Sequence, residues 1–323
     1  MPIQFPTLSD RAVTGILFNE LEDAASRSWT SQIANQLTSD QNAETYAGAG
    51  VVPAMREWAG GKLVKNVREL SHTITNKDFE STIELTRKDL RRDKTAQLIM
   101  KAQELAQRAV EHEAKLLSTL INTANAATEG LAYDGQFFFD TDHSVGNSGT
   151  IDNDISIDIS ALPTGDTTGT HGTVTAPSVG EMALGIQQAI QQIYGFVDDE
   201  GEPTNTGAQS FAVMVPTSLW AAASTAVRVN NLAQGFDNPL VGSGLNVSVI
   251  ANPRLTWTDS YAVFVTDGGI KPFISQIESG PMIEILGEGS DYSFFNKAHL
   301  FSVIKSGNVG FHQFTKACYV TMT

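Results

Sequence analysis

Two adjacent segments of this chain are too long to bury their own apolar faces inside a compact domain. Residues 63–90 predict a pair of charged strands, because apolar and polar side chains alternate with the period of two that marks a half-buried strand. Residues 93–125 predict a single helix, since apolar residues recur at spacings of three and four. At 1.5 Å per residue this helix would run roughly 50 Å, which exceeds the diameter of a small domain. We therefore expect a subunit whose contacts are completed by neighbouring copies.

The predicted strand pair is a hairpin whose tip lies at Thr75, Asn76, Lys77 and Asp78. Such a ribbon has one face to bury and one face for solvent, so it needs a partner surface. The apolar face of its second strand carries Phe79, Ser81, Ile83 and Leu85, and the polar face carries Glu80, Thr82, Glu84 and Thr86.

Charge divides the chain into two unlike parts. The 323 residues have a formal net charge of -15, yet residues 1–120 hold 15 Lys and Arg against 16 Asp and Glu, whereas residues 121–323 hold 6 against 20. Dense balanced charge suits an arm that reaches across other subunits through pairs of opposite sign. The acidic remainder argues against dedicated nucleic-acid binding, which requires basic residues that neutralise phosphates. The clustered basic residues are predicted to form a solvated or inter-subunit face: Arg87, Lys88, Arg91, Arg92 and Lys94.

The chain carries one cysteine, Cys318, which excludes an internal disulfide and a thiolate metal site. The favoured interpretation is a small buried residue in a strand. No apolar stretch has the length of a membrane span, and the first residues lack the pattern of a signal peptide. We therefore expect a soluble protein made in the cytoplasm, with 41% hydrophobic residues to build its cores.

The rest of the chain predicts further helices and strands. A helix is expected to begin at Ser9 or Asp10 and to end before Trp29, with a connector over 38–61. Residues 177–285 are expected to form a mixed α/β block of normal domain size. The final strands, 300–305 and 309–322, are expected to be joined by a turn at 306–308 and to return beside the long helix.

A series of short motifs follows one another along the chain. They are WAGGK at 58–62, FESTI at 79–83, YDGQFFF at 133–139 followed by His143, DNPLVG at 237–242, NPRL at 252–255 and KPFISQ at 271–276. In this order they resemble the major head subunit of Mu-like phages, over roughly residues 30–320.

The resemblance implies an α+β protein with the Hong Kong 97-type capsid fold of tailed phages. Its parts would be an N-terminal arm and connector over 1–54, an extended E-loop hairpin over 55–92, a peripheral (P) domain over 93–175 with its spine helix at 93–125, a mixed α/β axial (A) domain over 176–285, and a return to the P domain over 286–323.

The resemblance also implies a non-enzymatic function. Copies of the chain would assemble into hexamers and pentamers of an icosahedral shell around double-stranded DNA, in a virion head assembled in the host cytoplasm. Scaffold, protease and portal proteins, together with minor cement proteins, would be its partners. No cofactor, metal, membrane or sequence-specific nucleic acid is expected. The E-loop is expected to contact the P domain of a neighbouring subunit. Its expected contact residues are Trp58, Phe79, Glu80, Ile83, Leu85, Arg87, Arg91 and Arg92.

A metal-dependent hydrolase is the main competing hypothesis. Asp140, Asp142 and His143 are close in sequence and offer the oxygen and imidazole ligands that a divalent cation binds. The cluster has no second motif at defined spacing, so turns capped by Asp134, Asp140 and Asp142 are the favoured interpretation.

Calcium binding and a different structural function in the virion are also compatible with the sequence. Calcium could bind at Asp152, Asp154 and Asp158 or around residues 198–202, although neither segment fits the EF-hand pattern. A structural virion protein outside the head, such as a tail component, would have a similar composition.

Overall fold

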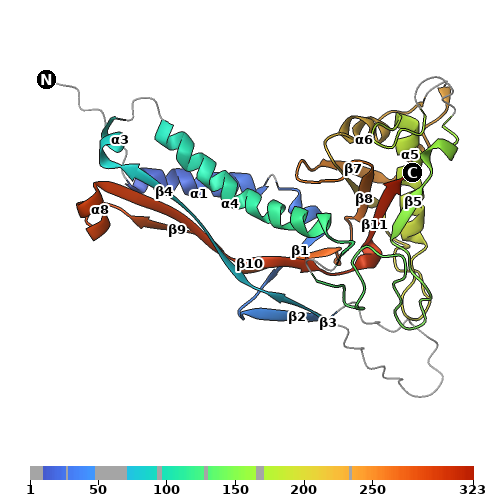
Figure 1. Ribbon diagram of the computed structural model, residues 1–323, viewed down its shortest axis with the longest axis horizontal. Helices are drawn as coiled ribbons and strands as arrows, with labels where there is room; N and C mark the ends of the chain where they lie inside the picture. Colours follow the sequence, from blue (N-terminus) through green and yellow to red (C-terminus); the bar gives the residue numbers. More distant parts are fainter. Residues whose placement is uncertain are drawn as a thin grey trace, which may run out of the picture.

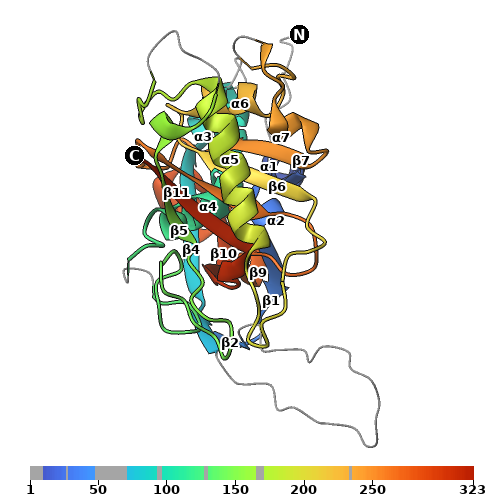
Figure 2. The same cartoon turned by 90° about the vertical axis from the view of Figure 1, so that its right-hand side faces the viewer.

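The computed structural model describes residues 10–26, 28–47, 71–92, 97–126, 130–164, 171–232 and 235–323. It is elongated: a long twisted sheet, backed by helices on one face, extends from a body built on a second sheet (Figure 1). Seen from the body end, helix α5 (Val179–Tyr194) lies across the second sheet (Figure 2).

The long sheet has the strand order β1-β9-β10-β4. β10 pairs antiparallel with both β4 and β9, while β1 adds in parallel to the first residues of β9. The strands are β1 (Ala34–Thr38), β4 (Lys77–Thr86), β9 (Phe273–Leu286) and β10 (Ala298–Phe311).

Two long helices cover one face of this sheet. α1 (Asp10–Ser26) and α4 (Gln97–Asn122) confirm the two helices predicted from apolar spacing. With 26 residues, α4 is about 39 Å long at 1.5 Å per residue. Leu17 of α1 and Ala106 of α4 are fully buried where the two helices and the sheet meet. The short helices α2 (Thr30–Ile33) and α3 (Arg87–Arg92) flank the sheet.

The pairing predicted for the hairpin is wrong. β3 (Ser71–Thr75) pairs with β2 (Ala43–Ala47), whereas β4 pairs with β10, so the two strands on either side of Asn76 belong to different sheets. The predicted tip at residues 75–78 is the place where the chain leaves a two-stranded ribbon and enters the long sheet. Alternation along β4 did mark a half-buried strand, but it could not identify the partner strand.

The body sheet has the order β5-β11-β8-β6-β7. β6 and β8, at its centre, are almost wholly buried, as continuous apolar runs predict. A capping box formed by Ser178 and Glu181 begins α5, which packs on this sheet. The remaining body elements are β5 (Asp154–Ile157), η2 (Ile159–Ala161), β6 (Ser210–Val215), α6 (Trp220–Ala226), α7 (Pro239–Gly242), β7 (Asn246–Ala251), β8 (Ser260–Val265), η4 (Phe314–Lys316) and β11 (Ala317–Met322).

The predicted turn at residues 306–308 is also wrong. β10 runs through these residues without reversing, and only its register against β9 shifts there. Gly307 permits this because a Cβ at this position would lie 2.3 Å from the carbonyl oxygen of Gln276. β10 therefore returns beneath α4 as predicted, but β11 joins the body sheet, where Cys318 is buried.

Polar contacts join the second half of α4 to the body. Asn252 donates from Nδ2 to Ser118 Oγ at 2.9 Å, and Asn122 donates to the carbonyl of Arg254 at 2.8 Å. Arg254 also pairs with Glu111 at 3.1 Å. Within the described part of the chain, no helix is long and apolar enough to span a membrane.

Because β4 is part of the long sheet, its apolar face should stabilise the isolated subunit. Leu85 is 3% exposed and lies in the cluster under α1 and α4. We expect Leu85→Ala to lower the free energy of unfolding by about 2–5 kcal/mol, measured by urea denaturation of dilute, unassembled subunits. Thr82→Ala, on the exposed face of the same strand, should cost under about 1 kcal/mol. Equal stability of both variants and wild type would contradict the intramolecular packing of β4.

Candidate subunit-contact surfaces

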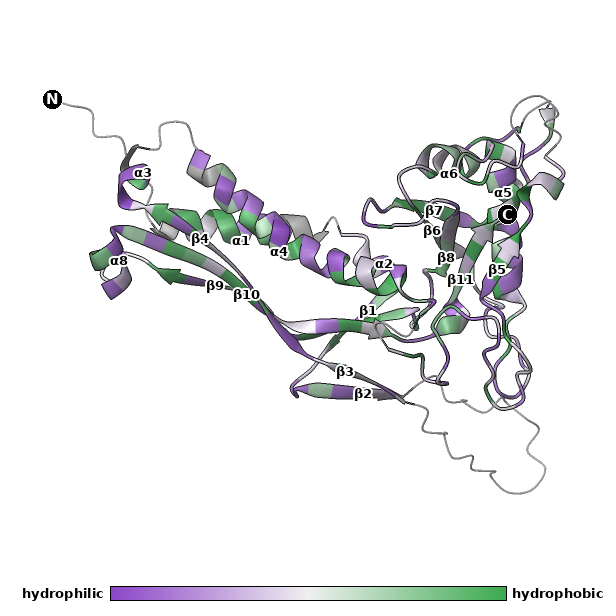
Figure 3. Ribbon diagram, viewed as in Figure 1, coloured by the Kyte–Doolittle hydropathy of each residue, from purple (hydrophilic) through white to green (hydrophobic). Residues whose placement is uncertain are grey.

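The far end of the long sheet presents exposed aromatic side chains. Between β9 and β10, helix α8 (Asp291–Asn296) carries Phe294 and Phe295, which are 76% and 77% exposed. Their rings meet edge to face, with centroids 5.3 Å apart. Figure 3 shows α8 at the end of the long sheet remote from the body. We call Phe294 and Phe295 the aromatic tip.

The aromatic tip is held in place by contacts at both ends of α8. Ser290 caps the helix by accepting a hydrogen bond from the backbone of Ser293. Lys297 adopts a left-handed conformation with φ of 53° and accepts from the backbone N–H of Arg87 at 2.9 Å. The Arg87 guanidinium also lies 3.6 Å from Glu288. A short helix capped at both ends fixes the direction of its side chains, so the exposure of both rings is built into the fold.

The predicted contact residues on β4 divide between its two faces. Leu85 is buried within its own chain, so almost none of its side chain is exposed for the predicted contact with a neighbour. Phe79 packs on His112 of α4 with ring centroids 4.2 Å apart, and Ile83 packs half-buried against the same core as Leu85. Glu80 is exposed and accepts a hydrogen bond from Thr82 at 2.6 Å. The contact face predicted from alternation is therefore the face that α4 already covers.

The remaining predicted contact residues lie at or beyond the ends of the described segments. Arg87 begins α3, beside the aromatic tip. The backbone of Arg91 and Arg92 completes α3, but their side chains lie outside the described residues, as does Trp58. Sequence reasoning did not single out Phe294 and Phe295. Apolar spacing could not have identified them, because the helix that carries them has only 6 residues.

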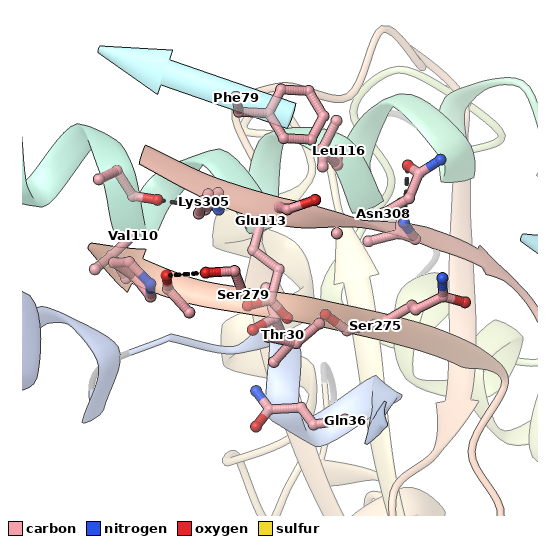
Figure 4. A pocket seen from close by; sticks show the side chains of 18 of the residues that line it. Thr30, Gln36, Phe79, Val110, Glu113, Leu116, Ser275, Ser279, Lys305 and Asn308 are labelled. Carbon is pink, nitrogen blue, oxygen red and sulfur yellow. Dashed lines mark hydrogen bonds between the residues drawn. The ribbon is translucent and has the colours of Figure 1, made fainter. Parts of the chain in front are cut away.

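A cavity of about 250 Å³ lies between α4 and the middle of the long sheet (Figure 4). Lys305 reaches into it from β10 and donates from Nζ to the carbonyl of Ala109 at 3.2 Å, and burial lowers the pKa of this amine. Glu113 Oε1 is buried there without a hydrogen-bond partner. His112 directly precedes Glu113 in α4. Burial, followed by the charges of Lys305 and Lys115, lowers the pKa of His112 to about 4. The helix and sheet are thus loosely packed at this point.

The possible metal ligand His143 is enclosed by contacts with other residues of the chain. His143 is fully buried, with Nδ1 2.6 Å from Asp134 Oδ2 and Nε2 3.2 Å from the carbonyl oxygen of Phe138. Its ring stacks on Phe314 with centroids 3.8 Å apart. Both ring nitrogens are occupied by contacts within the chain, so neither is open to a cation.

The neighbouring carboxylates accept hydrogen bonds from nearby backbone N–H groups. Asp140 accepts from the backbone N–H of Thr141 at 2.7 Å, and Asp152 accepts from that of Asp154 at 3.0 Å. Across the described residues, no group of three His, Cys, Asp or Glu side chains is placed to hold a metal ion. Neither the hydrolase site nor the calcium sites therefore gain support from the geometry.

A comparison with known families matches slightly less than half of the chain. Residues 12–162 match the family model described as Mu-like prophage major head subunit gpT. This segment runs from α1 to the start of the body. The resemblance predicted from the sequence motifs is confirmed there, while the motifs at 237–242, 252–255 and 271–276 lie beyond the matched segment.

Two curated proteins show the same relationship. The Mu-like prophage FluMu major head subunit of Haemophilus influenzae is 31% identical over 115 residues, which is 36% of each chain. The major capsid protein of Escherichia phage Mu is 30% identical over 125 residues, which is 39% of each chain. The alignments thus span well under half the length of these curated relatives.

Solved structures share the whole fold. A chain of the bacteriophage JBD30 procapsid matches with a TM-score of 0.53 at 22% identity, covering 96% of this chain and 74% of that chain. The virus-like particle from Pyrococcus furiosus matches with a TM-score of 0.51 at 11% identity, covering 96% and 98%. The capsid of cyanophage P-SCSP1u matches with a TM-score of 0.52 at 12% identity, covering 91% and 86%. The predicted α+β class and Hong Kong 97-type capsid fold are confirmed.

The carboxylates beside His143 predict a pH-dependent stability. Burial, followed by the charges of Asp152 and Asp140, raises the pKa of Asp154 from 3.8 to about 6. A raised pKa means that ionisation of Asp154 destabilises the folded state. This loss of folding stability is absent below about pH 4, grows between about pH 4 and 6, and is complete above about pH 6. Asp154→Asn should therefore raise the melting temperature at pH 7.5 and leave it unchanged below pH 4.

The matched control for this prediction is Asp158. Hydrogen bonds from Ser160 lower its pKa, so Asp158→Asn should lower the melting temperature at pH 7.5. Calorimetry of dilute subunits at the two pH values measures both effects. A gain for Asp154→Asn that persists below pH 4 would show that the charge of Asp154 is not the cause.

Proposed function

We propose that this chain is the major capsid protein of a Mu-like tailed phage, whose copies associate as hexamers and pentamers of an icosahedral shell around double-stranded DNA. The observation that carries the proposal is the long sheet backed by α1 and α4, which ends in the aromatic tip and from which the β2–β3 ribbon projects (Figure 1). The family match over residues 12–162 and the capsid fold support it. Both rings of the aromatic tip are largely exposed within the described chain.

The domain division follows the same proposal. The arm and connector occupy 1–54, the P domain 93–175, the A domain 176–285, and residues 286–323 return towards the P domain. Within this scheme β2 lies in the connector and pairs with β3, which lies in the E-loop at 55–92. β4, expected in the same E-loop, belongs to the long sheet. Two strands cross these proposed bounds: β9, mostly within 176–285, lies in the long sheet beside β10, and β11, within 286–323, lies in the body sheet.

A structural function without catalysis is consistent with the closed surroundings of His143 and with the chain's acidic charge. An acidic surface does not adhere to DNA, which favours a container over a DNA-binding protein. The proposed location is the virion head, assembled in the host cytoplasm. Scaffold, protease, portal and minor cement proteins are the proposed partners during assembly.

The first test is self-assembly of the purified full chain. We expect sedimentation velocity to show particles larger than the monomer as protein concentration rises, and electron microscopy to show closed shells. Because each copy carries a net charge of -15, assembly should increase between 0.1 and 1 M salt, where the Debye length falls from about 10 Å to about 3 Å. A monodisperse monomer at every concentration and salt would contradict the proposal, and tubes in place of shells would favour another virion protein.

The second test concerns the aromatic tip. Phe294→Ser with Phe295→Ser should raise the concentration at which assembly begins by at least about tenfold, because each buried phenylalanine contributes about 1.5–3 kcal/mol to a contact. The melting temperature of dilute subunits should not change, since both rings are exposed. The matched control is Phe294→Tyr with Phe295→Tyr, which keeps the aromatic area and should assemble nearly as wild type. Normal assembly of the double serine variant would exclude the aromatic tip from the contacts.

A further inference from the structure

A buried polar cluster lies where the β2–β3 ribbon leaves the long sheet. Gln276, on β9, is 2% exposed and is at its centre. Its Oε1 accepts from the Tyr46 hydroxyl of β2 at 2.9 Å, and its Nε2 donates to Asn76 Oδ1 at 2.6 Å and to the carbonyl of Ile74 at 3.4 Å. One side chain of the long sheet thus bonds to both strands of the ribbon.

Asn76 extends the cluster around the base of the ribbon. Its Nδ2 donates to Ser39 Oγ at 3.1 Å and to the carbonyl of Gln41 at 2.7 Å, while its backbone N–H donates to the carbonyl of Asn42 at 2.8 Å. Asn308 of β10 donates to the carbonyl of Thr75 at 2.8 Å. The chain entering β2 and the chain leaving β3 are therefore bound to each other and to β9 and β10.

Close packing on β10 adds a second constraint. Ile74 is buried against Gly310, where a Cβ would lie 2.4 Å from Ile74 Cδ1 and 3.2 Å from His72 Nε2. The absence of a side chain at Gly310 therefore leaves the space that the Ile74 side chain fills against β10. Because an isolated two-stranded ribbon is marginally stable and bends easily, its direction has to come from such contacts at its base.

Hydrogen bonds fix the direction of the ribbon more narrowly than apolar packing does. Apolar contacts are non-directional, whereas a buried amide with several fixed partners accepts only a narrow range of orientations. Displacing the ribbon would leave Gln276 and Asn76 with unpaired buried groups, which is costly at low dielectric.

We infer that Gln276 is a positioning residue that sets the angle at which the ribbon leaves the subunit, and thereby selects the neighbouring copy and the curvature with which that copy is engaged. This inference rests on the proposed function, because it assigns the ribbon to contact with a second copy of this chain. Tyr46 fixes the β2 side of the ribbon and Asn76 fixes the β3 side.

The experiment measures the ribbon angle and shell assembly on the same full-length variants. Spin labels at Thr45→Cys on β2 and Glu284→Cys on β9 report the distance between ribbon and sheet, and both positions are exposed. Cys318 is buried and should take up no label in the parent chain. The test variants are Gln276→Leu, which removes all three side-chain hydrogen bonds, and Tyr46→Phe, which removes one hydroxyl. The matched control is Gln36→Leu, a glutamine exposed on the adjacent strand β1.

We expect one narrow distance distribution for wild type and Gln36→Leu, and a broadened or shifted one for Gln276→Leu and Tyr46→Phe. The yield of regular closed shells, counted by electron microscopy, should fall at least about threefold for Gln276→Leu, with irregular particles in their place. Tyr46→Phe should show the same change in smaller measure, with a smaller loss of melting temperature than Gln276→Leu, because it leaves only Gln276 Oε1 without its partner. A purely stabilising residue would lower the melting temperature and leave the distances and the particles unchanged.

The two proposals fail in different ways. If wild type forms shells and both variants keep its distance distribution, or form shells of wild-type yield and shape, the positioning role of Gln276 is overturned and the capsid function stands. If Gln276→Leu does not fold, Tyr46→Phe decides the outcome by the same readouts. If wild type forms no shells, the proposed function fails and the claim about neighbouring copies fails with it, whatever the distances show.

Discussion

The packing of α4 is the interaction on which the rest of the structure depends. The first half of the helix places Leu105 and Ala106 in the core shared with α1 and the long sheet, whereas the second half places Leu117 and Ile121 in the core of the body. Two separate hydrophobic cores thus share one rigid rod, and the long sheet can extend away from the body because α4 covers it along its length. The polar contacts of Ser118 and Asn122 fix the body on this rod.

Local patterns in the sequence were sufficient for the helices and insufficient for the sheets. α1, α4 and α5 follow from apolar spacing and capping residues, because these signals lie within each helix. The partner of β4 is β10, more than two hundred residues later, and no local pattern carries that information. For the same reason a glycine at position 307 indicated a turn, although it serves a close approach between β9 and β10.

The contact residues named from the sequence stay a prediction. Apolar alternation on β4 indicated a face that is buried against another surface, and α4 buries this face within the same chain. The exposed residues that we propose as contacts, Phe294 and Phe295, lie on a helix of only 6 residues, which is too short for any periodicity to show. The motif around His143 illustrates the opposite error, because ligand-type residues close in sequence proved to be hydrogen-bonded to their own loop.

The position of β11 has a consequence for synthesis on the ribosome. β5 reaches the body sheet only through β11, which enters between β5 and β8. Translation must therefore pass β11 before β5 has any strand to pair with, and until then the apolar edge of β8 stays open. Since such long-range pairing is slow, this sheet is completed only after residues 317–322 have emerged, and the open edge of β8 is exposed to non-native pairing until then.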